Sequence, residues 1–354
     1  MSLKKNGLLF EFINYNDPLS ALINEKANEL FQSVRKLDVL QTDIDTSGKA
    51  YFLSHHVGQR LFFSTQSSAH IIYHAVKMTG MDITRISFTD YGAGLGTLFL
   101  LAGKLGFKNV FYNDLFPSWT SNAKILCNGL DIKITGFITG DIDVLLNYGK
   151  TNNIHFDILA SRNVIEHIYN LKSFYTKLYN SKLVTVCYAT TTANYHNLAM
   201  RLKHYRFHYK IENIQFKKQR EEEIRKQIPG ISDKDCKQLV TLTRGRAFED
   251  FTNTINAFMN KEPISPVPNL RTNTCNCVTG VWAENMISRN DYKSIIENAG
   301  YTMEFTAGFW DTHYKYRALN WFTGLLNKKI KWIGNKGYWI SPFVNVVAHT
   351  NKHE

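Results

Sequence analysis

A run of alternating glycines follows an acidic residue in the segment Asp90-Tyr-Gly92-Ala-Gly94-Leu-Gly96. Glycine lets a ligand approach the backbone closely and adopts positive φ angles without strain. The apolar stretch that follows reads as a helix, whose first N–H groups are free and whose dipole is positive at that end. The spacing is not the dinucleotide-binding G-x-G-x-x-G, because threonine or phenylalanine stands where the third glycine belongs, at positions 97 and 99. A carboxylate before the first glycine suits a cationic ligand group, such as an amino group, better than a pyrophosphate.

Two further aspartates follow the next two expected strands. Asp114 ends the run Val110–Asp114, 18 residues after Gly96, and Asp141 follows the run 133–138. In an open α/β sheet, ligands bind outside the carboxyl ends of the strands. A tight strand–helix turn alone would leave these two aspartates unexplained. The pattern therefore predicts one ligand site along this edge of the sheet.

These landmarks resemble the motifs of class I S-adenosylmethionine (SAM)-dependent methyltransferases, whose first motif is [D/E]-x-G-x-G-x-G. The resemblance implies that Asp114 accepts both ribose hydroxyls of SAM and that Asp141 and Ile142 meet the adenine. The segment Asn163-Val-Ile-Glu-His167 is similar to the "E-H" segment of ubiquinone-biosynthesis-like O-methyltransferases. The resemblance covers residues 83–190. It implies a SAM site made of Asp90, Gly92, Gly94, Gly96, Asp114, Leu115, Asp141, Ile142 and Asn163.

Candidates for the chemistry and for the methyl acceptor lie mostly outside these motifs. A hydroxyl acceptor usually needs a base with a pKa near neutrality, and histidine is the first choice. His167 follows the fourth expected strand and His196 the fifth, so they are the two candidate bases. For both histidines, a purely structural role in packing is the alternative interpretation. The candidate acceptor-binding side chains, which surface or core positions would equally explain, are Arg244, Arg271, Trp282 and Trp310.

We expect no metal site. The pair Cys275-Asn-Cys277 lacks two further ligands at close spacing, so it is not a zinc signature. In the ubiquinone-biosynthesis-like family the residue matching Asn163 is commonly glutamate, and this departure argues against the metal-assisted form of that site.

The elements that must position these residues alternate between strands and helices over 81–192, which predicts βαβ units and a parallel sheet. The expected fold is a Rossmann-like, seven-stranded class I methyltransferase sheet. A helical segment over 1–80 precedes the SAM-binding core at 81–192. A mostly helical insertion or lid on the acceptor side follows at 193–287. Strands six and seven fall within 288–354 and flank an aromatic-rich insertion at 309–340.

Composition excludes several protein classes. With 44% hydrophobic and 20% charged residues the chain is globular, and its five scattered cysteines do not form a disulfide scaffold. No window has 18 uninterrupted apolar residues and the N-terminus is a poor secretory signal, so we expect no membrane span and a cytoplasmic protein. The net charge of +12 is compatible with a nucleic-acid partner. However, no RNA-binding segment or N-P-P-Y-type tetrapeptide is present.

We therefore expect methyl transfer from SAM to an oxygen, in preference to a nitrogen, of a small anionic metabolite or sugar or glycan precursor. Two alternatives stay open. One is an RNA or protein methyltransferase, and the other is a catalytically silent SAM-binding subunit of a partner enzyme. The sequence also leaves a homodimer open.

Overall fold

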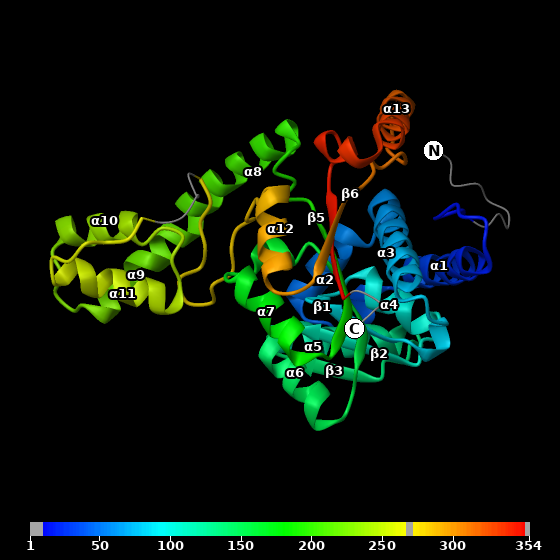
Figure 1. Ribbon diagram of the computed structural model, residues 1–354, viewed down its shortest axis with the longest axis horizontal. Coiled ribbons are helices and arrows are strands. Elements are labelled where there is room, and N and C mark those ends of the chain that lie inside the picture. Colours follow the sequence, from blue (N-terminus) through cyan, green and yellow to red (C-terminus); the bar gives the residue numbers. More distant parts are fainter. Residues whose placement is uncertain (1–9, 267–271, 351–354) are drawn as a thin grey trace.

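A seven-stranded sheet forms the centre of the molecule in the computed structural model, which describes residues 10–266 and 272–350 (Figure 1). Its strand order is β3-β2-β1-β4-β5-β7-β6. The strands are β1 (Ser87–Tyr91), β2 (Asn109–Asp114), β3 (Gly136–Thr139), β4 (Phe156–Arg162), β5 (Val184–Thr191), β6 (Thr302–Ala307) and β7 (Val344–His349). The Rossmann-like seven-stranded α/β fold that the sequence predicts is confirmed.

Six strands run in one direction, and β7 alone is antiparallel to its neighbours β5 and β6. The carboxyl ends of β1 to β6 therefore share one edge of the sheet, which we call the ligand edge. All five residues of β1 are buried, as expected of a central parallel strand whose two faces are covered by helices.

Helices that connect the strands cover the sheet, and three more precede it. The N-terminal helices are α1 (Pro18–Lys36), α2 (Thr46–His55) and α3 (Gly58–Thr79), with short turns η1 (Val39–Gln41) and η2 (Ile83–Arg85). The connecting helices are α4 (Thr97–Lys104), α5 (Pro117–Gly129), α6 (Ile142–Thr151), α7 (Leu171–Ser181) and α12 (Arg289–Asn298), with the turn η3 (Ile165–His167) after β4. Within residues 10–80 the expected helical segment is thus present.

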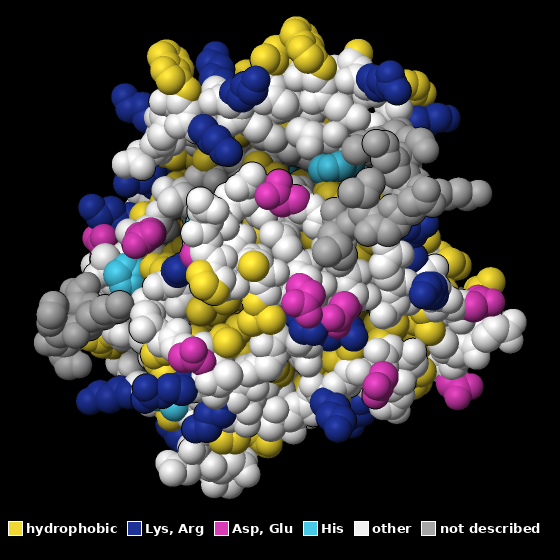
Figure 2. Space-filling model, turned by 90° about the vertical axis from the view of Figure 1, so that its right-hand side faces the viewer, with side chains coloured by type: hydrophobic (Ala, Val, Ile, Leu, Met, Phe, Trp, Pro, Cys, Tyr) yellow, Lys and Arg dark blue, Asp and Glu magenta, His cyan; other side chains and the backbone are white. Residues whose placement is uncertain are grey.

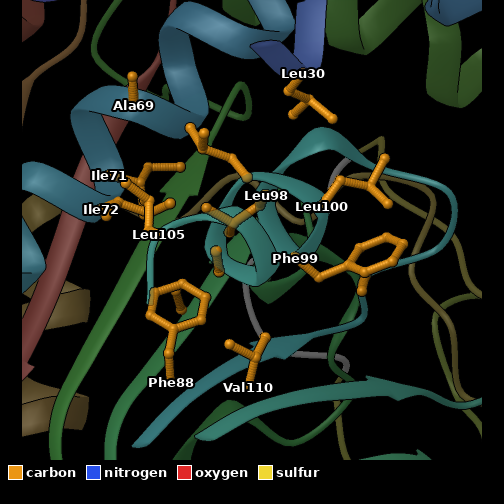
Figure 3. Close-up of a cluster of buried hydrophobic side chains, with 14 of the residues drawn as sticks. Leu30, Ala69, Ile71, Ile72, Phe88, Leu98, Phe99, Leu100, Leu105 and Val110 are labelled. Atoms are coloured by element: carbon orange, nitrogen blue, oxygen red, sulfur yellow. The ribbon is translucent and has the colours of Figure 1, made fainter. Parts of the chain in front are cut away.

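The largest buried cluster lies where α4 is enclosed between the sheet and the N-terminal helices. Phe88 of β1 and Val110 of β2 lie against one side of α4, while Leu30 of α1 and Ile72 of α3 belong to the same cluster (Figure 3). The sequence of α4 is apolar all round because it is enclosed all round. The N-terminal helices are thus part of the core that supports the glycine turn.

The insertion between β5 and β6 forms a helical arm. Its elements are α8 (Leu198–Ile211), a single π turn η4 (Glu212–Phe216), α9 (Lys217–Gln227), α10 (Asp233–Leu242) and α11 (Phe248–Met259). Helix α8 leads away from the sheet, and α9 to α11 lie at its far end (Figure 1). The arm has a small core of its own, around Leu239 and Phe251. Helices α9 to α11 lie off to one side of the sheet, and the role of the insertion as a lid stays a prediction.

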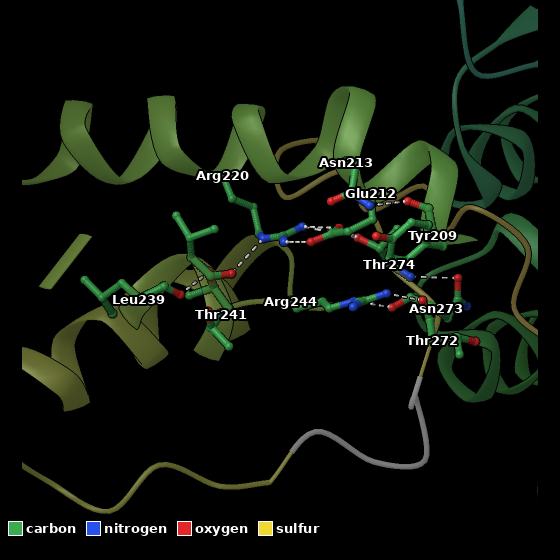
Figure 4. A network of polar contacts seen from close by, with 12 residues as sticks. Tyr209, Glu212, Asn213, Arg220, Leu239, Thr241, Arg244, Thr272, Asn273 and Thr274 are labelled. Atoms are coloured by element: carbon green, nitrogen blue, oxygen red, sulfur yellow. Dashed lines mark hydrogen bonds and ion pairs between the residues drawn. The ribbon is translucent and has the colours of Figure 1, made fainter. Parts of the chain in front are cut away.

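A buried ion pair holds the arm to the chain that returns from it (Figure 4). The guanidinium of Arg220 pairs with the Glu212 carboxylate and also donates to the carbonyl of Val240. The hydroxyl of Thr274 donates to the same carboxylate at 2.7 Å. Both members of the pair are buried.

We expect Arg220→Ala to lower the free energy of unfolding by about 3–5 kcal/mol, because it leaves the Glu212 carboxylate buried without its counter-charge. Urea denaturation followed by far-UV circular dichroism measures the change. The control is Lys218→Ala, which breaks an exposed ion pair with Glu222 on the same helix and should cost under about 1 kcal/mol. Equal costs for the two variants would contradict the structural role of the pair.

A second insertion joins β6 to β7. It holds the helix α13 (Arg317–Ile333) and the turn η5 (Gly334–Trp339). Because β6 ends and β7 begins at the ligand edge, α13 and η5 lie on that side of the sheet (Figure 1). Among the helices of the described residues, none has the length and apolar character needed to cross a membrane.

Candidate functional site

The glycine turn after β1 has the backbone that its sequence requires. Gly92 and Gly94 have φ angles of +66° and +49°, in the left-handed region that favours glycine. A Cβ atom at Gly92 would lie 2.7 Å from the side chain of Val164, whereas one at Gly94 would meet nothing within 4 Å. Gly96 precedes the first residue of α4. The turn is thus packed tightly at Gly92 and open at Gly94.

Asp114 fixes this turn from the neighbouring strand. Its carboxylate accepts the Gly94 N–H at 2.9 Å and the Phe116 N–H at 3.0 Å. Burial raises the pKa of Asp114. Leu115, which follows it, is exposed. Asp114 and the open part of the turn therefore lie together, as a ribose-binding acid and a close backbone approach require.

Asp90 supports the turn from beneath. Its carboxylate is buried and accepts the N–H of Phe99, in the first turn of α4, at 2.9 Å. Burial raises the pKa of Asp90 to about 8. The sequence suggests that Asp90 meets a cationic ligand group, whereas in the structure one of its oxygens is engaged by the helix start.

Asp141 begins helix α6, and its carboxylate accepts two backbone N–H groups of the first turn. Ile142, the next residue, is buried. Asn113 ties this region to β2, since its amide donates to the carbonyls of Ile138 and Gly140. The ends of β2 and β3 are thus held side by side, with Asp141 at the surface beside them.

Asn163 turns the chain at the end of β4. Its φ is +57°, a conformation that asparagine tolerates better than most residues. Its N–H donates to the Thr190 carbonyl and its side-chain oxygen accepts the Thr192 N–H. Asn163 thereby links the ends of β4 and β5 and directs the next residues into η3.

Two carboxylates and two imidazoles meet just beyond this turn, and we call Glu166, His167, His204 and Glu284 the carboxylate–histidine cluster. One ligand atom each of Glu166, His167 and Glu284 lies within 4.8 Å of the others. His204 Nδ1 lies 3.8 Å from a carboxylate oxygen of Glu284. Glu284 arrives on the returning segment, in which the Trp282 and Asn285 N–H groups donate to the carbonyls of His167 and Glu166.

The inner carboxylate oxygens of this cluster form no hydrogen bond of normal geometry among the described residues, although the Thr191 side chain and the Thr192 backbone lie near enough to Glu166 to favour its ionised form. Neither carboxylate oxygen of Glu166 has a hydrogen bond of normal geometry, and the same holds for Oε2 of Glu284. Glu166 is wholly buried. Burial raises the pKa of both carboxyl groups, and for Glu284 the charge of Glu166 raises it further. A wholly buried carboxylate beside a half-buried one, with few donors between them, is costly unless a proton or a cation lies between the two.

Backbone carbonyls outside the cluster orient its two histidine rings. His167 Nδ1 lies 2.8 Å from the Trp282 carbonyl, and His204 Nε2 lies 2.9 Å from the Thr192 carbonyl. A carbonyl only accepts, so each of these ring nitrogens carries the proton. In the neutral form of each ring the other nitrogen carries a lone pair. This is the arrangement in which protein histidines bind metal ions.

The N-terminal helices contact the glycine turn, which the sequence did not indicate. A ring nitrogen of His56 is hydrogen-bonded to the Leu95 carbonyl within the turn, and burial lowers the pKa of His56 to about 4. The hydroxyls of Ser64 and Ser68 both bond the Thr97 hydroxyl at 2.8 Å. No local sequence pattern predicts these contacts, because the contacting residues are about 30 to 40 positions apart in the sequence.

The other sequence-predicted residues have structural contacts. His196 is not free to act as a base, because its Nε2 accepts the Arg289 N–H at 2.9 Å. Trp282 is buried, stacks on Tyr169 and donates to its carbonyl. Trp310 donates to the Ile340 carbonyl.

Of the two predicted arginines, only Arg244 lies within the described residues, and its guanidinium is engaged by backbone carbonyls. The guanidinium of Arg244 donates to the carbonyls of Thr272 and Asn273 at the base of the arm (Figure 4). Arg244 therefore fixes the returning segment, and these two hydrogen bonds occupy the guanidinium that was proposed to bind the methyl acceptor. Arg271 lies outside the described residues.

No model of a known protein family matches the chain, and no curated protein matches it. Among solved structures, it is similar to a SAM-dependent methyltransferase from Mesorhizobium loti, at 13% identity and a TM-score of 0.38, over 79% of this chain and 97% of that chain. It is also similar to a chain from a complex between the Haloferax volcanii Trm112 methyltransferase activator and a putative methyltransferase. The identity is 11% and the TM-score 0.37, over 80% of this chain and 90% of that chain.

A third similar structure concerns the conversion of a disulfide bond into a thioacetal group in echinomycin biosynthesis. The identity is 21% and the TM-score 0.26, over 34% of this chain, which spans about half (49%) of that one. At these identities, function is inferred below from the residues of this chain.

Proposed function

We propose that this protein is a SAM-dependent methyltransferase that methylates an oxygen of a small acceptor held at the carboxylate–histidine cluster. One observation carries the proposal. The open glycine turn with Asp114 and the buried cluster follow adjacent strands at the same edge of the sheet. The packing of Val164 against Gly92 joins the two parts.

The residues present fit SAM. The space beside Gly94 is open, so a ligand can approach the Gly94 backbone closely. Asp114 lies beside it and offers carboxylate oxygens to the ribose hydroxyls. Asp141 and Ile142, at the end of the next strand, are the proposed adenine contacts. SAM supplies an electrophilic methyl group, so the protein has to orient the acceptor and exclude water.

The cluster also fits a divalent cation, contrary to our expectation from the sequence. Carboxylates and imidazoles, here two of each, are the ligand types that zinc, manganese and iron accept. Glu166, His167 and Glu284 would hold the ion, with His204 beside Glu284. The ion would lower the pKa of a hydroxyl bound to it. With or without an ion, Glu166 and Glu284 offer buried oxygens that take up the proton which the acceptor hydroxyl must lose.

An untargeted assay tests the proposal. Purified protein is incubated with methyl-labelled SAM and a fractionated cell extract, with and without added divalent cation, and labelled products are identified by mass spectrometry. We expect one labelled O-methyl product that is absent with the Asp114→Ala variant. A product labelled in RNA or protein would favour the alternative methyltransferase class. SAM binding without turnover in any fraction would favour the silent partner subunit.

A further inference from the structure

Helix α13 has its polar side turned inward. The side-chain amide of Asn320 bonds both the N–H and the carbonyl of Tyr314, and that of Asn327 bonds both groups of Trp310. The buried Thr323 lies between them in sequence. A surface helix of a globular protein normally buries its apolar stripe and exposes its polar one. In α13 this order is reversed over much of the helix.

The outward side of α13 is apolar. Trp321 and Trp332 are 69% and 83% exposed, and Phe322 and Leu325 are also exposed. Their spacing of three, four and seven residues places them along one stripe of the helix. Isolated exposed apolar residues are ordinary, but a continuous stripe of large ones marks an interaction surface.

The stripe continues beyond α13. Trp339 of η5 is exposed, and its ring lies 5.1 Å from the ring of His196, just before α8. Tyr195 and Leu198 beside it are exposed as well. We call these residues of α13, η5 and the start of α8 the aromatic ridge. Figure 2 shows hydrophobic side chains projecting from the upper end of the molecule, where α13 lies, with Lys and Arg side chains between them.

The positive charge of the chain is concentrated at this ridge. Segments 193–211 and 315–336 hold ten of the 42 Lys and Arg residues and none of the 30 Asp and Glu residues. The rest of the chain is therefore nearly neutral. Lys328, Lys329 and Lys331 lie on α13 itself, and all three are exposed.

The aromatic ridge is both apolar and positively charged, and its binding partner must match both properties. A second copy would bring ten cations of one chain against ten of the other, which is repulsive. Nucleic acid would satisfy the charge but would not bury Leu325 and Phe322. The surface of an anionic bilayer satisfies both, because aromatic and Leu side chains enter the headgroup region while Lys and Arg meet the lipid phosphates.

We propose that the aromatic ridge docks the protein onto an anionic phospholipid bilayer. The ridge follows β5 and separates β6 from β7 at the ligand edge, so docking turns this edge toward the lipid. If the protein transfers methyl groups as proposed above, the docking also indicates which class of molecule it methylates. The acceptor is an amphiphile with a polar, hydroxyl-bearing headgroup that stays in the membrane.

Vesicle co-sedimentation tests the docking without reference to SAM or turnover. The probes are vesicles of phosphatidylcholine alone and with about one third phosphatidylglycerol. We expect wild-type protein to bind the anionic vesicles and to be released by high salt. Lys328→Glu/Lys329→Glu should weaken this binding at least about 30-fold, because each basic residue near the surface contributes about fivefold. Lys217→Glu/Lys218→Glu makes the same charge change on the arm and should leave binding unchanged.

A second pair of variants tests the apolar part. Trp321→Ser/Trp332→Ser should lower binding to anionic vesicles, while Met259→Ser, at an exposed site on the arm, should not. The docking is overturned if wild-type protein ignores anionic vesicles or if the arm variants lose as much binding as the ridge variants. It is also overturned if the ridge proves to join two copies, seen as a dimer that the Trp321→Ser/Trp332→Ser change dissociates. SAM affinity, measured separately by calorimetry, reports on the proposed function alone.

The acceptor class has its own readout. In the methyl-transfer assay, label should enter the organic-solvent extract of a membrane fraction, and the ridge variants should reduce this transfer. Label that enters only water-soluble metabolites contradicts the membrane-borne acceptor, even where methyl transfer itself is observed.

Discussion

Replacing Asp114 by alanine is expected to weaken SAM binding by roughly 100-fold or more, as measured by isothermal titration calorimetry. The proposed role of this carboxylate is to accept both ribose hydroxyls. A hydrogen bond to a charged group contributes about 1.5–3 kcal/mol, so losing two of them costs at least about 3 kcal/mol. The carboxylate also holds the Gly94 N–H, so the glycine turn loses a support at the same time.

Two controls separate binding from folding in that experiment. Asp114→Asn keeps one oxygen that can accept, so its affinity should fall between those of wild type and Asp114→Ala. Asp143→Ala removes an exposed aspartate that pairs with Lys177 on a neighbouring helix, and it should bind SAM normally. Unchanged affinity in folded Asp114→Ala would show that the cofactor site lies elsewhere.

Replacing Glu166 by glutamine is expected to have opposite effects on the protein without and with a divalent cation. At mildly alkaline pH the carboxyl groups of Glu166 and Glu284 must ionise side by side, although burial has raised the pKa of both. A glutamine cannot ionise, so the cation-free variant should be more stable than wild type. The same variant loses a charged ligand, so the stabilisation of wild type by Zn²⁺ or Mn²⁺ should largely disappear.

Thermal unfolding at a fixed alkaline pH, with chelator or with each ion, measures both effects. Methyl transfer should fall by two or more orders of magnitude in the variant while SAM affinity stays within about twofold, since Glu166 belongs to the acceptor part of the site. Glu304→Gln, at an exposed position on β6, is the matched control. A cation that stabilises Glu166→Gln as much as wild type would eliminate the metal site and leave the carboxylates as a proton-accepting pair.

The strands were predictable because each central strand is a short run rich in β-branched, aromatic and other apolar residues that ends at a turn signal. The glycine turn and Asp114 were predictable for the same reason, since their roles depend on positions next to strand ends. The local sequence of helix α6 does not by itself indicate a helix, because Asn147 and Gly149 interrupt its ten residues. These are residues typical of loops, and burial of Leu145 and Leu146 decides the outcome instead.

The carboxylate–histidine cluster could not be derived from local patterns. His204 and Glu284 lie 38 and 118 residues after Glu166, and only the path of the arm brings them back. The C-terminal third is rich in aromatic residues, for which the sequence leaves a pocket, a core and an interface open. The structure divides them, because Trp282 is buried whereas Trp321 and Trp332 face outward. Composition alone does not tell which side of a helix faces the protein.

The attachment of the arm has a consequence for local unfolding. His208 bonds the Thr272 hydroxyl with one ring nitrogen and the Glu284 carbonyl with the other, so the arm's return path and the cluster share one clamp. Native-state hydrogen exchange should then resolve two cooperative units. One contains α9 to α11 and the return path together with the Glu284 side of the cluster, and the other contains the sheet with its glycine turn. Opening of the first unit would dismantle the acceptor side while the cofactor side remained folded, so the protein would alternate between a state that holds SAM alone and one that is competent for transfer.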